Sequence, residues 1–96
     1  MFEIESPEAG HVVMRGRLDA AQAERAEAFL SVLEGACTIN LAELEYISSA
    51  GLGVLLKTHK QVAESGNRLR LIQVTNHIAD IFKYSGFDKL FDIETA

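Results

Sequence analysis

Ile47-Ser48-Ser49-Ala50-Gly51-Leu52-Gly53 marks a turn from a strand end into the longest predicted helix, which covers residues 50 to 64. Gly51 and Gly53 both fall in the first turn of that helix. Each glycine inside a helix costs up to about 1 kcal/mol relative to alanine. Two glycines beside two serines at a helix start break a local rule of folding, which indicates a functional surface.

The two serines of this turn allow two interpretations. A serine at a helix start accepts a hydrogen bond from a free amide of the first turn, which explains either Ser48 or Ser49 but does not need both. Close packing of the backbone would explain the glycines. The alternative is a phosphorylation switch, because free amides and a partial positive charge at a helix start suit an anion. A phosphate adds about −1.5 to −2 charges at pH 7.

The segments on either side of the turn predict alternating strands and helices. Strands are expected at residues 2–6, 11–18, 38–41, 69–74 and 91–93. Asp19 is the predicted N-cap of an alanine-rich helix that stops at Gly35. A helix carrying Ile78, Ile81 and Phe82 starts at Thr75 or Asn76, ends at Ser85-Gly86, and is followed by a helical turn at 87–90. The buried face of the 50–64 helix is expected at Leu52, Leu55, Leu56, His59, Val62 and Ala63.

This order predicts an α/β fold in one domain, residues 1–96, with helices packed on a mixed sheet of four to five strands. The formal charge of 9 − 14 = −5 argues against a nucleic-acid partner, which would need a basic face. Arg68 and Arg70 form an alternating pair at the start of the 69–74 strand and are expected on a solvated face or edge. Because the chain is short and shows no clustered acid–base residues, an interaction module is favoured over an enzyme.

The sequence does not favour a metal site, an intramolecular disulfide or a membrane-spanning segment. Cys37 is the single cysteine and is expected in the core. The histidines at 11, 59 and 77 lack the spacing of metal ligands, and no cofactor motif is present. The chain start lacks the features of a signal peptide, and no apolar run approaches 18 residues. These features predict a cytoplasmic protein without direct membrane insertion.

Three segments together resemble the STAS family, named for sulphate transporters and anti-sigma-factor antagonists. Residues 44–55 resemble its signature of an apolar residue, Asp, Ser, Ser or Thr, Gly, Leu and Gly. Gly16-Arg17-Leu18-Asp19 is similar to the Gly-Glu-apolar-Asp after its second strand, and residues 78–87 resemble its apolar-Phe-x-x-x-Gly-apolar helix. The resemblance covers nearly the whole chain in the right order. Ser48 stands at the usual Asp position, and Arg17 replaces the usual Glu.

The resemblance implies a stand-alone antagonist that works by partner switching. Such a protein binds an anti-sigma factor with a GHKL-type serine kinase domain, is released when phosphorylated, and is restored by a PP2C-type phosphatase. By position the phosphorylated residue is Ser49, with Ser48 as a rival. The expected partner-binding residues are Asp19, Ser48, Ser49, Ala50, Gly51, Leu52 and Gly53.

The sequence is also compatible with two other functions. One is a STAS adaptor without phosphorylation, as a subunit of a lipid-transport or stressosome-like complex, in which Ser49 only caps the helix. The other is a small enzyme or ligand-binding domain. A homodimer that pairs through the alanine-rich helix is a further open alternative for the assembly.

Overall fold

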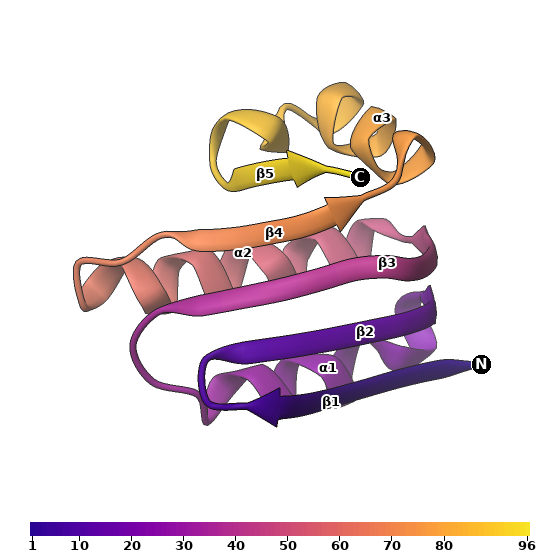
Figure 1. Cartoon of the computed structure of the whole chain (residues 1–96). Helices are drawn as coiled ribbons and strands as arrows, with labels where there is room; N and C mark the ends of the chain where they lie inside the picture. The colour runs from indigo at the N-terminus through magenta and orange to yellow at the C-terminus, as the bar shows by residue number, and fades with distance from the viewer.

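Five strands lie side by side in one sheet, in the order β1-β2-β3-β4-β5, in a computed structural model that describes residues 1 to 96 (Figure 1). β1 is antiparallel to β2, and each later strand is parallel to the one before it. The strands are β1 Phe2–Glu8, β2 His11–Leu18, β3 Cys37–Ile47, β4 Leu69–Val74 and β5 Asp92–Thr95. The α/β class and the mixed sheet expected from the sequence are confirmed.

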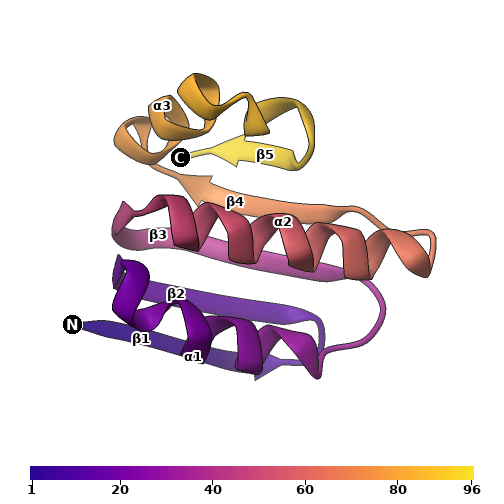
Figure 2. The same ribbon diagram turned by 180° about the vertical axis from the view of Figure 1, so that it is seen from behind.

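A helix joins each pair of parallel strands, and the helices cover one face of the sheet. Crossovers of this kind are right-handed, so connections that progress in one direction across a sheet stay on the same side. Figures 1 and 2 show α1 and α2 on one side of the strands from opposite directions. The helices are α1 Ala20–Ser31, α2 Ser49–Glu64, α3 Asn76–Ser85 and the short 3-10 helix η1 Phe87–Lys89.

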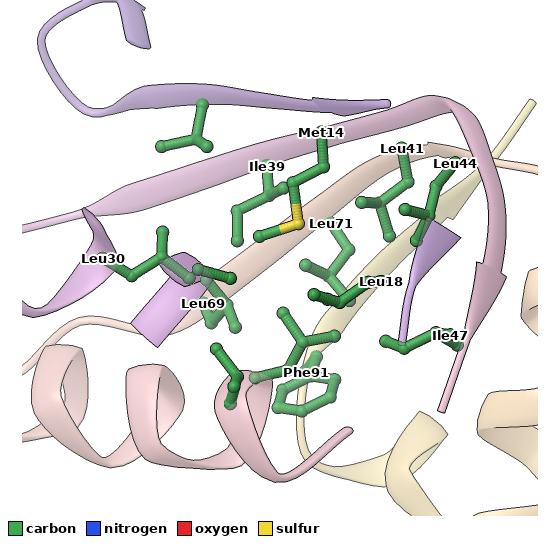
Figure 3. Close-up of a cluster of buried hydrophobic side chains, with 14 of the residues drawn as sticks. Met14, Leu18, Leu30, Ile39, Leu41, Leu44, Ile47, Leu69, Leu71 and Phe91 are labelled. Atoms are coloured by element: carbon green, nitrogen blue, oxygen red, sulfur yellow. The ribbon is translucent and has the colours of Figure 1, made fainter. Parts of the chain in front are cut away.

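The core fills the space between the sheet and these helices. Met14 from β2, Ile39 from β3 and Leu71 from β4 are fully buried, and Leu30 from α1 packs into the same cluster (Figure 3). Alternate residues of each strand point to this layer because side chains in a strand alternate between its two faces. Cys37 belongs to the same core, as expected, and burial raises the pKa of its thiol from 9.0 to about 11.

The opposite face of the sheet is open and charged. Arg15 pairs with Glu5 at 3.2 Å and with Glu43 at 3.1 Å, across three neighbouring strands. Two further cross-strand ion pairs are Arg68–Asp92 at 3.2 Å and Arg70–Glu94. Arg68 and Arg70 therefore lie on a solvated face, as their alternation predicts.

Several element boundaries differ from the sequence prediction. β1 continues to Glu8 and β5 covers Asp92–Thr95, where strands at 2–6 and 91–93 are predicted. α1 ends at Ser31, earlier than the predicted stop at Gly35, and Gln61 of α2 donates hydrogen bonds to the carbonyls of Leu30 and Leu33 at 3.1 and 2.7 Å, which satisfies free carbonyls at this end. Gly35 instead lies in the following loop with φ +75°. β3 has 11 residues where residues 38–41 were predicted, and its pairing with β2 shifts register twice. These irregularities interrupt the alternation that would reveal the strand.

The buried face of α2 is also rotated from the predicted one. Its buried residues are Gly51, Val54, Leu55, Thr58 and Val62. The predicted stripe was right at positions 55 and 62, whereas Ala63 is exposed. The hydroxyl of Thr58 donates to the carbonyl of Val54 at 2.9 Å, which satisfies this buried polar group within the helix. No helix in the structure combines the length and apolar character needed to span a membrane.

Candidate functional site

The candidate site lies where the carboxyl ends of the parallel strands meet one edge of the sheet, on the right of Figure 1. α1, α2 and α3 all start at this edge, with Asp19, Ser48 and Thr75 as their N-caps. Open parallel α/β sheets generally bind ligands outside the carboxyl ends of their strands. The sequence-predicted residues at 19 and 48–53 therefore come together at this edge.

Ser48 is the structural serine of the pair. Its side-chain oxygen accepts a hydrogen bond from the amide of Gly51 at 3.1 Å, and its carbonyl accepts from the amide of Leu52 at 2.9 Å. Its own amide donates to the carbonyl of Leu18 at 2.9 Å, so Ser48 is hydrogen-bonded both to α2 and to β2. Ser48 thus caps α2 and joins its start to the end of β2.

Ser49 is the first residue of α2 and is exposed to solvent, as is Ala50 after it. None of the hydrogen bonds within the protein involves the Ser49 hydroxyl, because Ser48 already satisfies the cap. The two serines that sequence alone could not separate therefore differ in environment. One is committed to the fold, and the other presents its hydroxyl outward.

The two glycines of the turn also have different roles. A Cβ atom added to Gly51 would lie 2.8 Å from Ile47 Cγ1 and 2.9 Å from both Leu18 Cγ and the Leu18 carbonyl oxygen. Gly51 is therefore required for the close packing of α2 on the ends of β2 and β3. A Cβ added to Gly53 would meet no atom within 4 Å. Packing does not explain Gly53, which leaves a bare backbone surface beside Ser49.

Asp19 occupies the corresponding position at the start of α1. Its Oδ1 atom accepts a hydrogen bond from the amide of Gln22 at 3.2 Å, and the residue is half-buried, so the predicted cap is confirmed. A shallow groove between the first halves of α1 and α2 adjoins Asp19. Its lining combines small residues with charged ones: Ala20, Ala23, Glu24, Glu27, Ala50, Gly53, Val54 and Lys57. Ala50 and Gly53 thus lie in a hollow, while Leu52 is half-buried and packs against the core.

Arg17 and Tyr46 complete the surface on the open-sheet side of the turn. The Arg17 guanidinium carbon lies 4.4 Å from the centre of the Tyr46 ring, and the two residues are direct partners across β2 and β3. Tyr46 had no assigned role in the sequence prediction. Its partnership with Arg17 was concealed because a register shift between Gly16 and Arg17 changes which residues of β3 face them.

Comparison with known proteins identifies the family. The family model described as "Mlab, STAS domain" matches residues 1–93. This chain belongs to the STAS domain family. The resemblance carried by residues 16–19, 44–55 and 78–87 is therefore confirmed. A relative from Bordetella bronchiseptica, named "Putative anti-sigma factor antagonist BtrV", is 34% identical to this chain over 84 aligned residues. The alignment covers 83% of this chain and 72% of the relative.

Solved STAS structures share this fold at lower sequence identity. The structure of a "putative anti-sigma factor antagonist" from Thermotoga maritima has a TM-score of 0.82 and 17% identity, covering 99% of this chain and 86% of the other. SpoIIAA of Bacillus in its phosphorylated form has a TM-score of 0.69 and 22% identity, with coverages of 99% and 92%. At these identities the likeness concerns the fold alone.

Proposed function

We propose that this STAS domain is an anti-sigma-factor antagonist in a partner-switching system. In its unmodified form it binds an anti-sigma factor that carries a GHKL-type serine kinase domain. Phosphorylation of Ser49 releases that partner, and a PP2C-type phosphatase reverses the mark. The observation that carries the proposal is the exposed hydroxyl of Ser49 beside a cap that Ser48 already provides. The name of the Bordetella relative supports the antagonist role.

The environments of the two serines favour Ser49 as the acceptor over its rival. Phosphorylation of Ser48 would attach a bulky dianion to the oxygen that accepts the hydrogen bond from the Gly51 amide. The backbone of Ser48 is also held by its hydrogen bond to the Leu18 carbonyl, so the residue has little room to move. Phosphorylation of Ser49 needs no rearrangement of the fold, because its side chain points into solvent. A kinase also approaches Ser49 across Ala50 and Gly53, which leave little side-chain bulk around it.

The chemical step is a phosphoryl transfer from ATP that the partner kinase performs. The bond between the γ-phosphorus and the bridging oxygen of ADP breaks, a new bond forms to the Ser49 oxygen, and the serine proton is lost. The phosphatase cleaves the serine–phosphate bond with water and releases inorganic phosphate. The STAS domain supplies the acceptor hydroxyl and the docking surface, and the partners supply the catalysis.

Release of the partner follows from the electrostatics of the interface. The residues of the turn itself, from Ser48 to Gly53, are uncharged and mostly small, so a partner can pack closely on them. A phosphate there would be desolvated in an interface built for a hydroxyl. Burying a phosphate whose charge is not fully matched costs several kcal/mol, enough for a loss of about 10²-fold or more in affinity.

Paired substitutions at Ser49 test this proposal. Calorimetric titration of a cognate GHKL-type serine kinase should show that Ser49→Asp weakens binding strongly. Ser49→Asn and Ser49→Ala should bind like the wild type, because they carry no charge. Equal affinities for the Asp and Asn variants would contradict a charge-controlled interface.

The second candidate function is an adaptor subunit without phosphorylation. It is favoured by the matching family model, which is described as Mlab and not as an antagonist. Affinity purification from native cells distinguishes the two functions. A serine kinase as the partner supports the antagonist role, whereas an ATP-binding cassette complex with no phosphate on Ser49 supports the adaptor role.

A further inference from the structure

Arg17 differs from the other arginines on the open sheet face because it has no carboxylate partner. Arg15, Arg68 and Arg70 each form ion pairs with glutamate or aspartate side chains of neighbouring strands. The guanidinium of Arg17 takes part in none of the protein's ion pairs. It is exposed and lies over the ring of Tyr46, 4.4 Å from its centre. The charge of Arg17 is therefore available to an anion.

The strand register places Arg17 next to the serine turn. Arg17 is opposite Tyr46, and Tyr46 precedes Ser48 by two residues at the end of β3. From the spacing of parallel strands and the rise per residue, the Cα atoms of Arg17 and Ser48 are about 8 Å apart. Ser49 follows within one further Cα–Cα step of about 3.8 Å. An extended arginine and a phosphoserine together span this distance.

We propose that Arg17 binds the phosphate of phosphorylated Ser49, leaving the ring of Tyr46 to do so. The inference rests on the proposed function, which makes Ser49 the phosphorylated residue. It adds a residue within this chain that responds to the modification. Arg17 is a positioning residue for the phosphate and takes no part in the transfer of the phosphoryl group.

Physical chemistry favours this exchange of partners. A cation over an aromatic ring at an exposed site is held weakly. A guanidinium can instead donate two parallel, charge-assisted hydrogen bonds to a phosphate, a geometry that makes arginine the preferred residue for phosphate recognition. Phosphorylation would then alter two parts of the surface at once, since it adds an anion at Ser49 and uncovers the ring of Tyr46.

A titration of the phosphorylated protein tests the contact without any kinase. Phosphoserine is incorporated at position 49 during translation, and the second ionisation of the phosphate is followed by ³¹P NMR. A guanidinium beside the phosphate favours the dianion and so lowers its pKa. Because exposed charge pairs are weak, Arg17→Gln should move the midpoint upward by about half a pH unit. Arg68→Gln removes the same charge at a residue paired with Asp92 and should leave the midpoint unchanged.

The signals of the Tyr46 ring provide a second readout in the same samples. They should shift on phosphorylation in the wild type, as Arg17 leaves the ring, and should not do so in Arg17→Gln. Equal phosphate midpoints in the Arg17→Gln and Arg68→Gln proteins would overturn the inference. That outcome would leave the proposed function standing, whereas a kinase that never modifies Ser49 would defeat the proposed function without affecting this measurement.

Discussion

The amide of Ser48 donates a 2.9 Å hydrogen bond to the carbonyl of Leu18, and this bond ties the start of α2 to the end of β2. The same carbonyl limits what can occupy position 51, because a Cβ there would lie 2.9 Å from its oxygen. Ser48, Leu18 and Gly51 therefore form a rigid base for the turn. Ser49 stands on this base with its hydroxyl exposed, which is the arrangement that a reversible mark on the surface requires.

The two glycines of α2 should respond to alanine with opposite signs. Gly51→Ala forces a methyl group into Ile47 and Leu18, and overpacking of this kind costs about 1–3 kcal/mol of stability. Gly53→Ala meets open space and replaces a poor helix former, so it should add about 0.5–1 kcal/mol. Urea unfolding of both variants measures the two changes. A destabilised Gly53→Ala protein would contradict the open environment described for this residue.

Gly53→Ala also tests the predicted role of this residue in binding. If Gly53 is bare so that a partner can approach the backbone, the added methyl group should weaken binding of the kinase although the fold becomes more stable. Ala63→Gly, the reverse exchange at an exposed position near the end of the same helix, is the control. It changes the stability of the helix but should leave the affinity for the kinase unchanged. Unchanged affinity in Gly53→Ala would remove Gly53 from the binding surface.

The two serines should differ in their contribution to stability. Ser48→Ala removes the oxygen that accepts from Gly51 and should cost about 1 kcal/mol. Ser48→Asn keeps a good cap and should change stability little, as should Ser49→Ala, which removes a hydroxyl that bonds to nothing in the protein. Thermal or urea unfolding distinguishes the three variants. A larger loss for Ser49→Ala than for Ser48→Ala would reverse the assignment of the cap.

Cys37 should make stability fall in alkaline solution. Its thiol pKa is raised by burial from 9.0 to about 11, so the unfolded chain loses its proton at a lower pH than the folded chain. This contribution is constant below about pH 9 and declines as the pH rises towards 11, by about 2–3 kcal/mol in total.

Unfolding of the wild type and of Cys37→Ala should be compared across this pH range. The difference between the two proteins isolates the thiol from the tyrosines and lysines that titrate in the same window. Parallel curves would show that the thiol does not resist ionisation in the folded state.

Local sequence patterns were enough to predict much of the secondary structure. The order of elements followed from alternating and helical patterns, and the caps at Asp19 and Ser48 agree with the preference of helix starts for short polar side chains. The predicted strands at 11–18 and 69–74 match β2 and β4. Apolar and polar residues largely alternate in these two strands, so the sequence pattern alone defines their bounds.

Contacts between distant segments account for what the sequence did not reveal. The hydrogen bonds from Gln61 to the carbonyls at the end of α1 come from another helix, and the buried face of α2 depends on how closely Gly51 approaches Leu18. The register shift that brings Arg17 over Tyr46 is likewise a property of two paired strands. At the site, the serine pair was visible in the sequence, but the division of roles between Ser48 and Ser49 required the geometry.

Mapping the phosphate after treatment with a cognate GHKL-type serine kinase and ATP tests the proposed switch most directly. Tandem mass spectrometry of the wild type should place one phosphate on Ser49. Ser48→Asn, which keeps the cap without a hydroxyl, should still be modified, and Ser49→Ala should not be. A phosphate on Ser48, or modification that persists in Ser49→Ala, would contradict Ser49 as the switch.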